Sequence, residues 1–82
     1  MSDKEIEVAI TSLNELKEDA SIPKNVRLKI DNAISLLSQK SEMHIRISKA
    51  LSELEDITED ANLQPYTRTQ VWDTISLLEK IK

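Results

Sequence analysis

Histidine and carboxylate side chains are the residues of this 82-residue chain that could do chemistry. His44 is the sole imidazole, and as a general base it needs a nucleophile and an orienting group beside it. The chain has several serines, yet no spacing selects one of them as a nucleophile. We therefore expect His44 to be a solvated surface residue and the protein not to be an enzyme.

Carboxylates gather near the ends of two helical segments. The denser group consists of Glu53, Glu55, Asp56, Glu59 and Asp60. The carboxyl end of a helix is partially negative and favours cations, so these acids need an explanation. One explanation is a site for a cation or a basic partner. A single helix face rarely supplies the six or more oxygens that calcium takes, and we predict neither a metal nor a cofactor.

The other explanation is structural. Asp19 and Asp60 can serve the start of the next helix, either as caps or as ion pairs with basic residues. The basic residues at the same distance along each half are Arg27 and Arg68. We predict the structural ion pairs Asp19–Arg27 and Asp60–Arg68.

Composition excludes several classes of site. The chain has no Cys, no Gly and one His, which leaves no zinc ribbon, disulfide framework or glycine-rich phosphate loop. The net charge of −4 disfavours nucleic acid as a partner, although Lys24, Arg27 and Lys29 form one small basic cluster. No apolar run is long enough to cross a bilayer, and the first residues do not form a signal peptide. We expect a cytoplasmic protein with no evident small-molecule substrate.

Four helical segments must position these residues. Apolar residues recur at helical spacing near 4–19, 23–39, 42–60 and 65–81, and no segment alternates as a strand does. The two halves are also related, because a shift of 41 residues aligns residues 4–41 with residues 45–82. The identical pairs include Ile6/Ile47, Ala9/Ala50, Leu13/Leu54, Asp19/Asp60, Arg27/Arg68 and Leu36/Leu77.

This repeat predicts a single all-α domain over residues 1–82. Its period lies in the range of HEAT-type helical hairpins, about 40–47 residues, but open solenoids generally need about three or more repeats to bury a core. We predict a compact antiparallel four-helix bundle made of two HEAT-like hairpins. The alternative is a short open stack that dimerises to cover its free face.

Two turn-to-helix segments carry a resemblance to a known family. Residues 21–27 (SIPKNVR) and 62–72 (NLQPYTRTQVW) resemble the two signatures of a small archaeal family, uncharacterised protein family zero-one-four-seven. The segment with Pro65, Arg68 and Trp72 is the more specific. The resemblance implies an archaeal origin, an all-helical fold and a cytoplasmic location, and it implies no activity and no functional residues.

Some apolar residues lie off the main helical stripes. They are Leu28 and Leu36 in the second segment and Leu77 in the fourth, and Trp72 is the sole tryptophan. If they join into one patch, an interface becomes the default interpretation. We predict a protein-interaction module that self-associates as a homodimer or binds another protein through Leu28, Leu36, Trp72 and Leu77, framed by Arg27 and Arg68. The alternatives are a nucleic-acid accessory protein using Lys24, Arg27 and Lys29, and a small enzyme or cation-binding protein.

Overall fold

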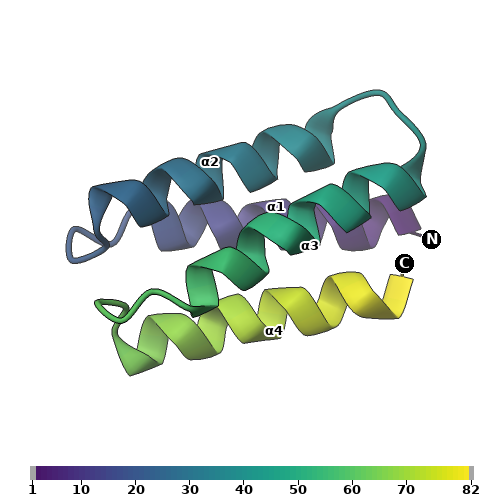
Figure 1. Cartoon of the computed structure of the whole chain (residues 1–82). Helices are drawn as coiled ribbons and strands as arrows, with labels where there is room; N and C mark the ends of the chain where they lie inside the picture. The colour runs from purple at the N-terminus through teal and green to yellow at the C-terminus, as the bar shows by residue number, and fades with distance from the viewer. Residues whose placement is uncertain (1, 82) are drawn as a thin grey trace.

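The computed structural model describes residues 2–81, which form four helices joined by three short loops. The helices are α1 (Ser2–Lys17), α2 (Lys24–Ser38), α3 (Met43–Thr58) and α4 (Pro65–Ile81). Each helix runs antiparallel to the next, so the start of α1 and the end of α4 lie at the same end of the molecule (Figure 1). The predicted all-α fold is confirmed, and residues 2–81 contain no strand.

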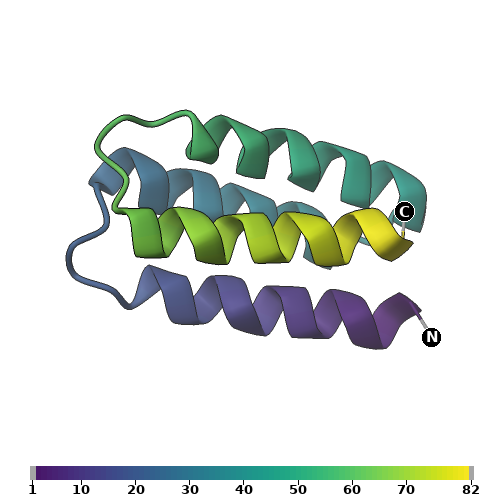
Figure 2. The ribbon, with the colours of Figure 1, turned by 90° about the horizontal axis from the view of Figure 1, so that it is seen from below.

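The four helices close into a bundle. α1 packs against α2 and α4, and α3 packs against the same two helices, whereas the diagonal pairs α1/α3 and α2/α4 make no direct backbone contact. The molecule is 33 Å long and 19 Å across in both other directions, as expected for a square array. Figure 2 shows α1 and α4 side by side and antiparallel. The two hairpins therefore cover each other's apolar faces, and the open stack does not form.

Apolar residues three and four positions apart on each helix meet in one core. A Leu or Ile side chain that leaves water in this way stabilises the fold by about 1.5–3 kcal/mol. Ile22 and Leu63, in the loops before α2 and α4, are also buried and close one end of the bundle. The buried apolar residues are Ile6, Ala9, Leu13, Leu16, Ile22, Val26, Ile30, Ala33, Leu37, Ile47, Ala50, Leu51, Leu54, Ile57, Leu63, Val71, Ile75 and Leu78.

Two helices end earlier than the sequence pattern predicts. We expected the first and third helices to reach residues 19 and 60, but they end at Lys17 and Thr58. Asp19 Oδ1 accepts the main-chain N–H of Ser21 at 2.9 Å, and Asp60 Oδ1 accepts that of Asn62 at 2.8 Å. These side chains give the backbone an alternative to helical hydrogen bonding, so each Asp forms the turn that follows its helix.

All three loops turn without a left-handed residue. No residue from 2 to 81 has a positive φ angle, and the chain has no Gly. The helices end instead on bonds that reach three residues back, from the N–H of Glu18 to the Glu15 carbonyl, of Gln39 to Leu36 and of Glu59 to Asp56. The glycine cap that satisfies the last carbonyls of many helices is therefore missing.

Contacts around two of the loops recur 41 residues apart. The turn made by Asp19 matches that made by Asp60, and the N–H of Ile22 bonds to the Asp19 carbonyl as that of Leu63 bonds to the Asp60 carbonyl. The internal repeat and the likeness to HEAT hairpins stay predictions from the sequence. Over residues 2–81, the helices are too short and too polar to cross a membrane.

Candidate protein-interaction surface

Arg27 and Arg68 do not pair with the carboxylates that the sequence suggested. Arg27 donates from Nε to the main-chain carbonyl of Lys17 at 3.3 Å and from Nη2 to that of Asp19 at 3.2 Å. Arg68 donates in the same way to the carbonyls of Thr58, at 3.2 Å, and Asp60, at 2.8 Å. The predicted ion pairs are therefore wrong, because both arginines donate to main-chain carbonyl oxygens and not to the carboxylates of Asp19 and Asp60. Each guanidinium caps the carboxyl end of the preceding helix, where a cation is electrostatically favoured.

Arg46 makes the same kind of contact and was missed by the sequence analysis. Its Nη1 donates to the main-chain carbonyl of Leu37, in the last turn of α2, at 3.0 Å. Each arginine is the fourth residue of its helix, and each reaches the end of the helix before it. That shared position, in a chain without Gly, is the sequence signal that could have indicated arginines capping the preceding helix. These three arginines hold loop ends and are not free to frame an interface.

Asp19 and Asp60 are structural residues of the loops. The main-chain N–H of Ser21, followed by the Ser21 hydroxyl, holds the pKa of Asp19 below its usual value. The N–H of Asn62 has the larger effect in lowering the pKa of Asp60, and the Asn25 side chain adds to it. In both cases hydrogen-bond donors of the protein lower the pKa of the carboxylate more than the nearby arginine does. The charge of the arginine has the smallest effect on each pKa.

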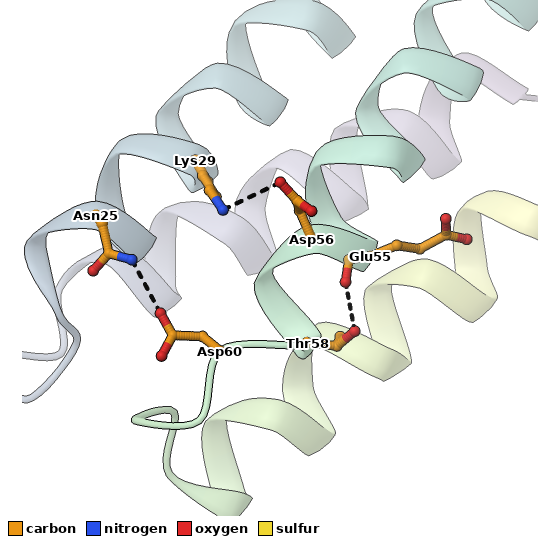
Figure 3. A network of polar contacts seen from close by, with 6 residues as sticks. All are labelled: Asn25, Lys29, Glu55, Asp56, Thr58 and Asp60. Carbon is orange, nitrogen blue, oxygen red and sulfur yellow. Dashed lines mark hydrogen bonds and ion pairs between the residues drawn. The ribbon is translucent and has the colours of Figure 1, made fainter.

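The acidic segment 53–60 does not converge on one point. Figure 3 shows Asp56 facing Lys29 of α2 and Asp60 facing Asn25, while the Glu55 side chain extends away from both. The distances are 3.2 Å from Lys29 Nζ to Asp56 Oδ2 and 3.0 Å from Asn25 Nδ2 to Asp60 Oδ2. Within residues 2–81, no three His, Cys, Asp or Glu side chains lie close enough together to hold a metal ion. Through Asp56 and Asp60 the segment makes side-chain contacts with α2.

The three residues of the predicted basic cluster differ in their surroundings. Arg27 is directed at the end of α1, Lys29 is paired with Asp56, and of the three only Lys24 is exposed rather than half-buried. A contiguous basic face, which a nucleic-acid backbone needs, is not formed by these three residues. The alternative of a nucleic-acid accessory protein stays a prediction from the sequence.

His44 lies exposed in the first turn of α3. Its side chain takes part in none of the hydrogen bonds of the described chain and lines neither of the two surface hollows described below. The convergence of His44 with carboxylates, which the enzyme alternative required, is therefore not observed among residues 2–81.

The apolar residues expected to form one interface are separated. Leu28 and Leu36 lie on α2, and Trp72 and Leu77 lie on α4, which is the helix diagonally opposite. Leu36 and Leu77 are half-buried and pack against the core, whereas Leu28 is 57% exposed and Trp72 47% exposed. The outward faces of diagonal helices point in opposite directions, so these four side chains cannot share a patch.

Three of the four seams between neighbouring helices are bridged by polar side chains. Lys17 of α1 pairs with Asp31 of α2 at 2.7 Å. Lys29 pairs with Asp56 across the α2–α3 seam, and Arg68 of α4 reaches the last residue of α3. The α1–α4 seam has no such bridge among the hydrogen bonds and ion pairs of residues 2–81. It is also the one seam whose two helices are not joined directly by a loop.

The α1–α4 seam is hollowed. One hollow, of about 350 Å³, is lined by Ser12, Glu15, Gln70, Asp73, Thr74 and Leu77. A second hollow, of about 310 Å³, adjoins it on the exposed face of α1 and is lined by that helix alone, through Lys4, Glu7, Val8, Thr11 and Ser12. They share Ser12, and we call the two together the α1–α4 groove. The groove is open to solvent along its length, which suits an extended partner better than a small molecule that must be enclosed.

The fold and this groove define a small antiparallel four-helix bundle with one unbridged, hollowed seam. The chain belongs to an uncharacterised protein family, UPF0147, whose model matches residues 1–81. The family that the two turn-to-helix segments suggested is thereby confirmed.

Two crystal structures share the fold. A protein of this family from Thermoplasma acidophilum is 30% identical, with a TM-score of 0.90 over 96% of this chain and 94% of that chain. A protein of unknown function from Methanococcus is 38% identical, with a TM-score of 0.89 over 95% of this chain and 90% of that chain. Both organisms are archaea. No curated protein matches the chain.

Proposed function

We propose that the protein is a non-catalytic protein-interaction module and that the α1–α4 groove is its binding surface. The observation that carries the proposal is the contrast between the seams. The other three are closed by ion pairs or by arginine contacts to main-chain carbonyls, and this one is hollowed and unbridged. Within residues 2–81, the polar side chains that line this seam make no hydrogen bond or ion pair across it, so they stay available to a partner.

The chemistry of the lining also supports binding rather than catalysis. The groove presents two carboxylates and a carboxamide near its middle, on Glu15, Asp73 and Gln70, and it contains neither the imidazole nor any of the arginines. The buried Thr74 hydroxyl is engaged by the Gln70 carbonyl at 3.2 Å and is not positioned as an activated nucleophile. A cytoplasmic location is part of the proposal, supported by the absence of Cys.

Site-specific photocrosslinking tests this proposal. A photoreactive side chain is placed at Thr11, on the rim of the groove, and in a control variant at Asn32, an exposed residue of α2. The labelled protein is irradiated in lysate of the source cell. We expect a discrete protein adduct from the Thr11 variant alone. Equal adducts from both positions, or none from Thr11, would count against the groove as the binding surface.

The same experiment also tests whether the partner is a second copy of this chain. A second copy bound in the groove gives an adduct of about twice 9.4 kDa with purified protein alone. Light scattering after size exclusion, across protein concentration, then gives the mass in solution. A mass near 9.4 kDa at all concentrations excludes a stable homodimer and leaves a different protein as the partner.

A further inference from the structure

We draw no further inference here: the strongest candidate, the outward surface of α4 on which Tyr66 is 70% and Trp72 47% exposed, carries none, because nothing in the described part of the chain shows what covers it.

Discussion

Arg68 Nη2 lies 2.8 Å from the main-chain carbonyl oxygen of Asp60, not from its carboxylate. The same guanidinium donates from Nε to the carbonyl of Thr58, so one side chain satisfies two acceptors where α3 ends. Last-turn carbonyls have no partner within their own helix, and glycine is the usual residue that lets the chain turn back to cap them. In a chain without Gly, arginine from the following helix takes over that task.

Removing this cap should destabilise the bundle. We expect Arg68→Ala to lower the free energy of unfolding by about 2 kcal/mol, because hydrogen bonds from a charged donor contribute about 1.5–3 kcal/mol. Arg68→Lys should recover less than half of the loss, since an ammonium lacks the planar fork that reaches two carbonyls. Urea denaturation followed by circular dichroism measures both. Lys24→Ala, an exposed control in α2, should change stability by less than about 0.5 kcal/mol.

The carboxylate of Asp60 should act independently of Arg68. A direct ion pair would give strong coupling in a double-mutant cycle. Because the arginine contacts the main chain, we expect the coupling between Asp60→Ala and Arg68→Ala to stay below about 0.5 kcal/mol. Asp19 and Arg27 provide the repeat-matched cycle, with the same expectation. A coupling above about 1 kcal/mol in either cycle would restore the ion pair that the sequence suggested.

The fold could be predicted because apolar spacing decides which side chains are buried. Ile6, Ala9 and Leu13 recur at helical spacing, and all are buried in the bundle. Helix ends were less predictable, since Asp19 and Asp60 divert the backbone by side-chain bonds that compete with the last helical turn. Hydrophobic periodicity carries no information on that competition.

The surface could be predicted only in part. Leu28 was correctly placed off the main stripe of its helix, and Trp72 was singled out as the sole tryptophan. A sequence does not say which helices are neighbours, and the helices of these two residues are diagonal. The α1–α4 groove was missed for the same reason, because Ser12 and Asp73 become neighbours only when the bundle closes. The acceptors of Arg27 and Arg68 were missed because residue types alone do not distinguish a main-chain carbonyl from a nearby carboxylate, and the arginines' shared position as fourth residue of each helix was not used.

Acid should weaken the loops first. The pKa of Asp60 is held below its ordinary value of 3.8 by the Asn62 N–H, so its contribution to stability is present above that value and is lost as the pH falls through the folded-state pKa. The pKa of Asp19 is also lowered, so its contribution to stability is lost in the same direction as the pH falls. We expect Asp19→Asn/Asp60→Asn to lose less stability than the natural protein between about pH 4 and pH 2. Glu55→Gln/Glu59→Gln, which removes two exposed charges, serves as the control, and equal slopes in both double variants would contradict the assignment.

The Lys29–Asp56 pair should contribute little. Its side chains are 35% and 61% exposed, and an exposed ion pair is screened by water and salt. We expect Lys29→Ala to cost about 0.2–1 kcal/mol, less than Arg68→Ala, and the cost to shrink further in about 1 M sodium chloride. Thermal melting at low and high salt measures it. A cost above that of Arg68→Ala would mean that the α2–α3 seam depends on this ion pair.

Leu13 and Leu54 occupy matching positions 41 residues apart, on α1 and α3, and both are fully buried. Truncation to Ala removes apolar contact and leaves a cavity, which costs about 2–5 kcal/mol in a close-packed core. We expect Leu13→Ala and Leu54→Ala to lose similar amounts, about 3 kcal/mol each, and to lower the melting temperature by about 15 °C. Leu28→Ala, at a position 57% exposed, should cost less than about 0.5 kcal/mol. A loss below about 1 kcal/mol for only one of the two buried leucines would show that the two hairpins do not share the core equally, because the deleted atoms are the same and only their surroundings differ.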